Sequence, residues 1–226
     1  MSNYYHGAKA SKQATSVSTP VVADSSIHLI VGTAPVHTVG GKVNEPVYAS
    51  NYAEAVAAMG YSDEWDKYDI CEEIYSSFKL YSNGPIIMVN VLDPAKHLKG
   101  AETVEKTLAG GITELPYEAV SDTVEVKGYD GEDSLTETYT RGEDYDLFYT
   151  DGVLRLERIE SGKIKADNAR LNIKFNSVDP SKVTKKEIIG GYDTNTNKSS
   201  GFELVDSVYP KYGVIPTLFL APNFST

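Results

Sequence analysis

The sequence predicts an α/β core, with a partly parallel sheet and flanking helices, and an inserted small antiparallel β domain. Two short apolar runs, residues 26–33 and 85–93, enclose helical patterns, which is typical of a parallel βαβ unit. From residue 112 to about 176 the apolar period becomes two, which indicates antiparallel strands. The α/β pattern then resumes. We therefore expect four segments: an extended N-terminal arm (1–24), the first part of the core (25–111), the inserted β domain (112–178) and an incomplete return to the core (179–226).

Charge and composition exclude several classes of function. The chain has 226 residues and a formal net charge of −11, without a basic patch, so a nucleic-acid partner is not expected. No window approaches the roughly 18 apolar residues that a membrane span needs, so no membrane partner is expected either. With one cysteine, Cys71, an internal disulfide is impossible, and its place in a helical pattern predicts a buried, inert thiol.

The first half of the core reads as strand, two helices and strand. Residues 26–33, "SIHLIVGT", form a β-branched run closed by glycine, as in a buried strand. Residues 51–59 predict a helix that Ser50 or Asn51 caps and Gly60 ends. Residues 68–80 predict a second helix, and "PIIMVNVLD" a second buried strand. The second helix presents one apolar stripe, formed by Ile70, Ile74 and Phe78 beside Cys71 and Tyr75.

The middle segment alternates apolar with polar residues. The runs "DTVEVKGYDG", "ETYTRGEDYDLFYTDG", "VLRLERIESG" and "ARLNIKFNSV" are broken by Tyr-Asp-Gly, Thr-Asp-Gly and Glu-Ser-Gly. Asp-Gly between alternating runs is a strong signal for a hairpin. This pattern predicts the small antiparallel domain.

The last segment returns to helices and a strand. "DPSKVTKKEIIGG" predicts a short capped helix. "SSGFELVDSVYPKYG" predicts another, with Phe202, Val205, Val208 and Tyr209 on one side. Residues 214–222, "VIPTLFLAP", predict a buried strand like the first one. Because an α/β domain rarely stops so soon after a buried strand, we expect an unfinished domain.

The glycine-rich loop after the first strand invites a comparison with phosphate-binding loops. Gly41 and Lys42 fit the middle of the P-loop pattern, but its first glycine falls on Val36 and its hydroxyl position on Val43. No Gly-x-Gly-x-x-Gly is present. A structural turn is therefore the favoured interpretation, and no cofactor is expected.

Other polar groups also fall short of a site. Asp193, Asn195 and Asn197 begin like a calcium loop, but Lys198 replaces the required glycine and Leu204 the required glutamate, so we expect a polar loop. The histidines are far apart in sequence, and His28 is expected to be a core residue. We therefore predict no metal site, no catalytic residue and no enzyme activity. A solvated hairpin tip is expected at Asp130, Glu132, Asp133 and Glu137.

Taken in order, these motifs resemble the contractile-tail sheath proteins of myovirus-type phages. The residues that carry the resemblance are "YYHGAKASKQATSVSTPVVADSSIHLIVGTAPVHTVGGKVNEPVYASNYAEAVAAMG", "GPIIMVNVLDPAKH", "RGEDYDLFYTDGVLRL" and "VTKKEIIGGYDTNTNKSSGFELVDSVYPKYGVIPTLFLAPNFS". Sheath proteins of this type continue past the last strand, and the C-terminal part that completes the core is missing here. The likeness thus covers the N-terminal and middle part of a sheath protein.

The resemblance implies a structural subunit that polymerises around a tail tube and contracts to drive injection. It implies as partners other sheath subunits, the tube protein, and baseplate and tail terminator proteins, in a virion tail assembled in the host cytoplasm. Extended arms that add strands to neighbours would keep such a polymer connected. The candidate inter-subunit arm residues are Tyr4, Tyr5, His6, Val17, Val21 and Val22.

Two other functions remain open at this point. One is a carbohydrate- or receptor-binding module of a phage particle, with the β domain as the binder. The other is a nucleotide- or phosphate-binding enzyme that uses Gly40, Gly41 and Lys42.

Overall fold

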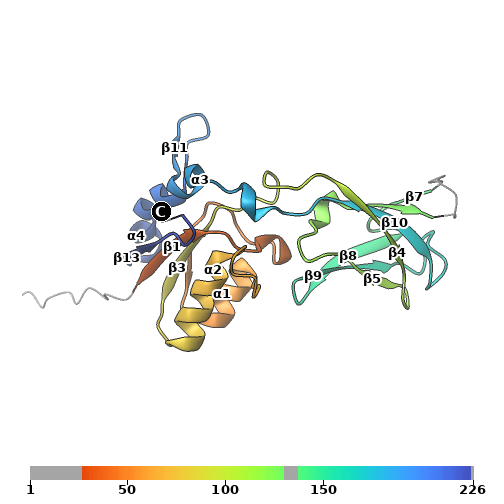
Figure 1. Ribbon diagram of the computed structural model, residues 1–226, viewed down its shortest axis with the longest axis horizontal. Coiled ribbons are helices and arrows are strands. Elements are labelled where there is room, and N and C mark those ends of the chain that lie inside the picture. Colours follow the sequence, from red (N-terminus) through yellow and green to blue (C-terminus); the bar gives the residue numbers. More distant parts are fainter. Residues whose placement is uncertain (1–26, 130–136, 225–226) are drawn as a thin grey trace, which may run out of the picture.

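The computed structural model describes residues 27–129 and 137–224, which form an α/β fold with small antiparallel sheets (Figure 1). A four-stranded mixed sheet has the strand order β13-β1-β3-β2. Strand β1 (His28–Gly32) pairs in parallel with β3 (Ile86–Asn90), as predicted, and with β13 (Leu218–Leu220). Strand β2 (Val47–Ala49) pairs antiparallel to β3 and was not predicted, because three residues are too few to show a period.

Helices cover both faces of this sheet. On one face Ile30, Ile86 and Met88 pack against α1 (Tyr52–Met59) and α2 (Asp69–Tyr75). On the other, alternate residues of the same strands pack against α3 (Lys185–Ile189) and α4 (Val208–Tyr212). Coverage on both sides explains why β3 reads as an unbroken apolar run, since all five of its residues are buried.

The ends of the first two helices follow local rules. The Asn51 side chain accepts a hydrogen bond from the Glu54 N–H at 3.0 Å, and Gly60 ends α1 with a φ of 74°. Helix α2 continues through the wider turn η2 (Ser76–Leu80), so the predicted second helix is confirmed with a change of winding. Cys71 is fully buried, and burial raises the pKa of its thiol to about 12.

The C-terminal helices differ in one respect from the prediction. The helix α3 has a reciprocal cap between Thr184 and Glu187. The following segment begins as the 3-10 helix η5 (Gly201–Ser207), whose period of three aligns Phe202, Val205 and Val208. Tyr209 comes one residue later and is 61% exposed, so it does not share one side with these three residues as predicted.

The last strand, β13, is not the buried strand that the apolar run predicted. Leu218 is 44% exposed and Phe219 is 50% exposed. The strand lies at the edge of the sheet, where β1 is its single neighbour within the described residues. Phe219 packs edge-on against Phe202 of η5, but the described residues cover the strand only in part.

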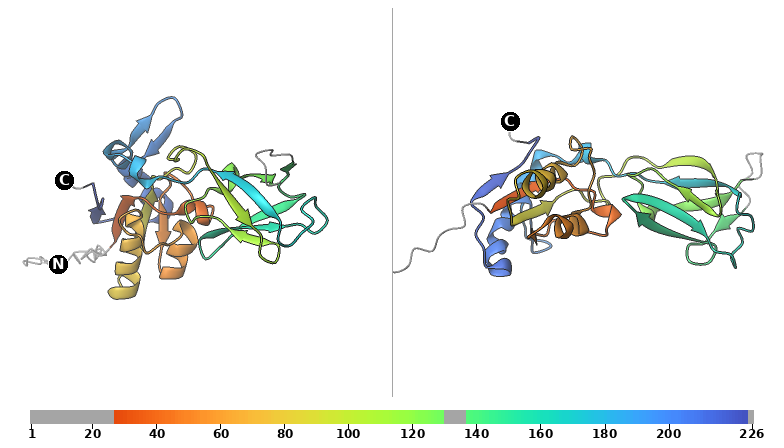
Figure 2. Two further views of the ribbon diagram at one scale, coloured as in Figure 1. Left: turned by 45° about the vertical axis from the view of Figure 1, so that its right-hand side comes forward. Right: turned by 90° about the horizontal axis from the view of Figure 1, so that it is seen from below.

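Two further sheets form a β part at the other end of the elongated molecule (Figures 1 and 2). They have the strand orders β4-β10-β6-β7 and β5-β9-β8. Leu154, Leu156, Ile173 and Phe175 are fully buried in one core that the two sheets share. The strands are β4 (Glu102–Thr107), β5 (Ile112–Glu114), β6 (Glu125–Gly128), β7 (Thr138–Tyr139), β8 (Tyr145–Thr150), β9 (Val153–Arg158) and β10 (Arg170–Phe175).

Turn chemistry sets the register of the β part. Asp151 and Gly152 have φ values of 51° and 79°, and they join β8 to β9 in a two-residue hairpin, as the Asp-Gly signal predicted.

Strand β4 precedes the predicted start of the β segment at residue 112, yet it pairs with β10. Its residues are mostly exposed, so its alternation is weak in sequence. The four segment boundaries given above remain predictions.

The smaller elements complete the described chain. A hairpin of β11 (Gly191–Asp193) and β12 (Lys198–Ser200) projects from the α/β part (Figure 1). Short 3-10 turns occupy η1 (Val36–Thr38), η3 (Ser121–Thr123) and η4 (Pro180–Lys182). The predicted short helix over "DPSKVTKKEIIGG" therefore consists of two pieces, η4 and α3.

Gly32 is required by a close approach at the end of β1. A β-carbon at this position would overlap the carboxylate of Asp69, the first residue of α2. We therefore expect Gly32→Ala to lower the free energy of unfolding by about 1–3 kcal/mol, the usual cost of overpacking. Urea unfolding measures this change.

Gly100→Ala is the matched control, because a β-carbon there meets nothing within 4 Å. We expect it to alter stability by no more than about 0.5 kcal/mol. Equal effects of the two substitutions would contradict the role given to Gly32.

Candidate functional site

The glycine-rich turn after β1 lacks the geometry of a phosphate site. The Gly41 N–H donates to the carbonyl oxygen of Val36 at 2.9 Å, and a β-carbon on Gly41 would overlap the carbonyl oxygen of Ala58. The Lys42 ammonium pairs with the Glu45 carboxylate at 2.8 Å. Because the lysine is neutralised and a carboxylate stands beside it, a phosphate would meet little attraction here. This agrees with the interpretation of the loop as a structural turn.

Glu45 is shared between two lysines. Lys211 of α4 reaches it at 2.7 Å, and hydrogen bonds from Lys211 and Lys42 hold the pKa of Glu45 below its usual value. A shallow depression of about 400 Å³ lies here, lined by Gly40, Gly41 and both lysines. Through Glu45, these ion pairs link the turn to α4, and this contact has a structural role.

The described histidines are each engaged in structural contacts. His28 lies on β1 and its Nδ1 contacts the Glu73 carboxylate of α2 at 2.7 Å. The His37 Nε2 donates to the carbonyl oxygen of Tyr117 at 3.0 Å, and burial lowers the pKa of His37. His97 Nδ1 accepts from the Asp93 N–H at 2.9 Å. These contacts place the histidines apart from one another.

The part of the chain that the structure describes has no cluster of metal-ligating side chains. Residues 27–129 and 137–224 contain no group of three or more His, Cys, Asp or Glu side chains that could hold an ion. The Asp193 carboxylate instead accepts from the Asn195 N–H at 2.8 Å and from the Thr196 hydroxyl at 2.9 Å, which closes the polar loop between β11 and β12.

Several predicted residues lie outside the described residues. These are the candidate arm residues Tyr4, Tyr5, His6, Val17, Val21 and Val22, and the hairpin carboxylates Asp130, Glu132 and Asp133. Glu137 is described and exposed.

The feature that most resembles a ligand site is a cavity at the carboxyl ends of β1 and β13. Strand β1 has β3 on one side and β13 on the other, so the chain reverses its winding direction here. In open α/β sheets the crevice at such a switch point is the usual place for a ligand. The cavity has a volume of about 320 Å³, and Thr33, Asp69 and Asn223 contribute to its wall.

Asp69 is the central group of this cavity. Its Oδ1 accepts from the Thr33 N–H at 2.6 Å and from the Thr33 hydroxyl at 3.1 Å. Its Oδ2 has no hydrogen-bond partner among the described residues, and the residue is 1% exposed. Burial raises the pKa of Asp69 to about 6, against the lowering effect of the bonds from Thr33. Sequence reasoning missed this residue, since nothing in "YDICEE" distinguishes it from a solvent-exposed helix start.

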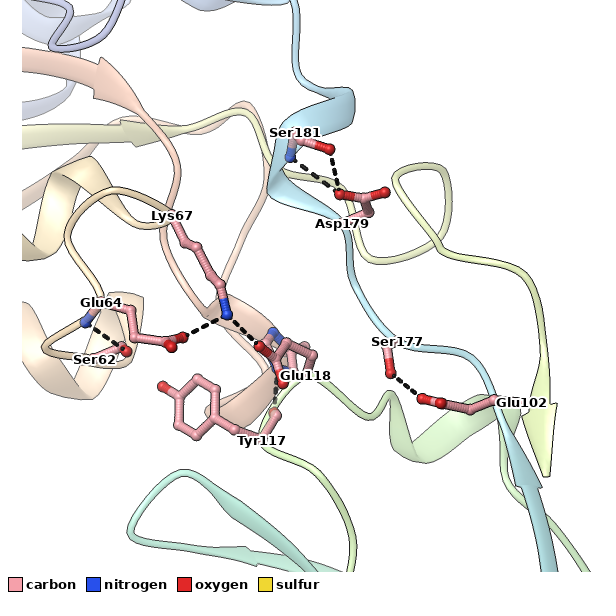
Figure 3. Close-up of polar contacts among 10 residues, drawn as sticks. Ser62, Glu64, Lys67, Glu102, Tyr117, Glu118, Ser177, Asp179 and Ser181 are labelled. Carbon is pink, nitrogen blue, oxygen red and sulfur yellow. Dashed lines mark hydrogen bonds and ion pairs between the residues drawn. The ribbon is translucent and has the colours of Figure 1, made fainter. Parts of the chain in front are cut away.

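Another part of the cavity wall contains Lys67 and Glu118, which lie where the α/β part meets the β part (Figure 3). The Lys67 ammonium lies between Glu64 at 2.8 Å and Glu118 at 2.9 Å. Burial alone would raise the pKa of Glu118, but Lys67 lowers it below its usual value. The Tyr117 hydroxyl donates to the carbonyl oxygen of Tyr61 at 2.8 Å, which adds a second link between the two parts.

We expect Asp69→Asn to change how stability depends on pH. The folded-state pKa of about 6 lies above the ordinary value of 3.8, so the folded state holds a proton that the unfolded chain releases. The contribution of Asp69 to stability is therefore present at low pH and is lost as pH rises through this window, by up to about 3 kcal/mol. Asparagine is neutral and retains the acceptor for Thr33.

Urea unfolding of both proteins between about pH 4 and about pH 7 measures the effect. The variant should gain stability relative to the original protein as pH rises. Asp63→Asn, at an exposed position nearby, serves as the control and should show a constant difference. A constant difference for Asp69→Asn as well would contradict the burial of a titrating carboxyl.

A second expectation concerns the glycine-rich turn. Magnesium-ATP and inorganic phosphate at millimolar concentration should not raise the melting temperature of the protein, because the Lys42 ammonium is already paired with the Glu45 carboxylate. A ligand present at about 100 times its Kd would stabilise the fold by about 2.7 kcal/mol, which a thermal-shift series detects. A saturable rise that Lys42→Ala abolishes would overturn this reading.

A known phage protein resembles this chain along nearly its whole length. No protein-family profile matches the chain. Over 226 residues, 99% of this chain, it is 29% identical to the tail sheath protein of Burkholderia phage BcepMu, and it spans 44% of the length of that protein. Within the described residues no helix has the length and apolar character to cross a membrane. The resemblance to phage tail sheath proteins that the motifs indicated is thus confirmed, and the chain is a relative of a tail sheath protein over its full extent.

Proposed function

We propose that this chain is part of a structural subunit of a contractile tail sheath, which polymerises around a tail tube and contracts to drive injection. The observation that carries the proposal is the likeness to a tail sheath protein along 99% of the chain. The role is structural rather than catalytic. The relative's description gives no support to a carbohydrate- or receptor-binding module.

The open edge of the mixed sheet supports assembly. Leu218 and Phe219 are neighbours on β13, so their side chains point to opposite faces, and both are about half exposed. The outer edge of β13 has no strand partner within the described residues. Such an edge is a ready template for another strand. We propose that a further strand of a sheath polypeptide pairs with it.

The arm supplies the second proposed contact between subunits. Residues 1–24, with Tyr4, Tyr5, His6, Val17, Val21 and Val22, would add as an extended strand to a neighbouring subunit. Heterologous contacts of this kind generate helical filaments. Contraction would then be a re-packing of connected subunits into a lattice of lower energy.

The shape of the molecule suggests how a subunit is oriented. The β part and the open edge of β13 lie at opposite ends (Figures 1 and 2). We propose that the β part faces outward while the mixed sheet contributes to the wall of the sheath. The remaining proposed partners are the tail tube, the baseplate and the tail terminator, in a virion tail assembled in the host cytoplasm.

Negative-stain electron microscopy tests assembly. Two proteins are compared: this chain, and this chain joined after Thr226 to the corresponding C-terminal part of the BcepMu protein. We expect helical tubes or short rods from the joined protein, because the added part supplies the strand for β13. Monodisperse particles from both proteins, with tail tubes added, would contradict the proposal.

A pair of substitutions in the joined protein sharpens the test. Phe219→Asp places a charge on the edge strand and should abolish the tubes. Tyr81→Asp is the control, because Tyr81 is 77% exposed and follows η2 in a different part of the structure. Circular dichroism verifies that both variants fold. Loss of tubes in both would mean that the effect is not specific to β13.

A further inference from the structure

The cavity at the carboxyl ends of β1 and β13 carries an excess of negative charge. Its ionisable wall residues are four carboxylates and two lysines, namely Asp66, Asp69, Glu118, Asp179, Lys67 and Lys99. Lys67 pairs with Glu118, and the charge of Lys99 also acts on Glu118. The two lysines therefore balance only part of the negative charge of the wall.

Three carboxylates in the wall form no ion pair within the part of the chain that the structure describes. Asp69 bonds to Thr33 through Oδ1, and Asp179 bonds to Ser181 through Oδ1 at 2.6 Å. Asp66 is exposed at the rim. Among residues 27–129 and 137–224, no Lys, Arg or His forms an ion pair with any of these three side chains. A buried or half-buried carboxylate without a partner is costly.

Asp69 gives an independent indication that this cavity binds a ligand. The side chain is almost fully buried, lines the cavity, and offers an Oδ2 that accepts no hydrogen bond from the described residues. Native structures rarely leave a buried polar atom unpaired. A group that carries N–H donors and a positive charge would satisfy Oδ2 and offset the charge of Asp66 and Asp179.

We propose that this cavity binds a guanidinium or ammonium group, which an arginine or lysine side chain of a second sheath polypeptide presents. The source of the group rests on the proposed function, whereas the charge preference rests on the cavity alone. The volume of about 320 Å³ accommodates one such side chain end. Charge-assisted hydrogen bonds to carboxylates are among the stronger polar contacts in proteins.

Nuclear magnetic resonance titration of the ¹⁵N-labelled chain tests the cavity. The probes are ethylguanidinium chloride and ethylammonium chloride, with ethyl phosphate as the anionic comparison and sodium chloride to hold ionic strength constant. We expect saturable shifts of the Thr33 and Asp69 amide signals with at least one of the two cations. Shifts with ethyl phosphate alone, or none that saturate, would overturn the proposal.

Three variants locate the response. Asp69→Asn should weaken the apparent affinity by about tenfold, the effect of losing one charge-assisted hydrogen bond. Asp66→Asn, at an exposed position that tolerates change, should weaken it as well and serves if Asp69→Asn does not fold. Asp63→Asn is the matched control, since Asp63 does not line the cavity, and should bind as the original chain does. Unchanged affinity in both cavity variants would overturn the proposal.

The result is distinguishable from the outcome of the assembly test. Tubes in the electron microscope without cation binding would remove the cavity proposal and leave the sheath function intact. Cation binding without tubes would leave the charge preference of the cavity intact and would remove a sheath polypeptide as the source of the bound group.

Discussion

The hydrogen bond from the Thr33 N–H to the Asp69 carboxylate is the contact on which the arrangement of the α/β part depends. It joins the end of β1 to the start of α2 across 36 positions of sequence. It also explains the residue before it, because Gly32 leaves room for the carboxylate. Asn90 does similar work at the end of β3, where its Oδ1 accepts from the Ala34 N–H at 2.9 Å and from the Leu92 N–H at 3.1 Å. Two buried polar side chains thus satisfy the backbone where the parallel strands end.

The junction between the α/β part and the β part combines several short contacts of different kinds. Lys67 meets Glu118, the Tyr117 hydroxyl meets the carbonyl oxygen of Tyr61, and the His37 ring meets the carbonyl oxygen of Tyr117. The Tyr117 ring also packs edge-on against His37 and Tyr68. Because these contacts join the two parts of the molecule, they hold the β part in a defined orientation.

Local patterns in the sequence predicted much of the fold. The cap at Asn51 and the hairpin at Asp151 and Gly152 depend on residues close together in the chain. The parallel pairing of β1 with β3 joins distant residues, but two apolar runs that enclose helical patterns indicated it. The exposure of Tyr209 was not predicted, because it depends on a 3-10 winding that a helical period does not anticipate. Asp69 was missed for another reason. Its burial and its partner Thr33 arise from tertiary packing, and its sequence neighbours resemble those of any helix start.

The half-exposed edge strand β13 has a consequence for the chain on its own. Within the described residues, Leu218 and Phe219 present apolar surface on both faces of a strand whose outer backbone groups are open. Natural proteins guard such edges with charge, bulges or proline, since unguarded ones promote aggregation. The three residues of β13 carry no charge. A polypeptide with this edge uncovered is therefore at risk of non-specific association, and the risk grows as its concentration rises.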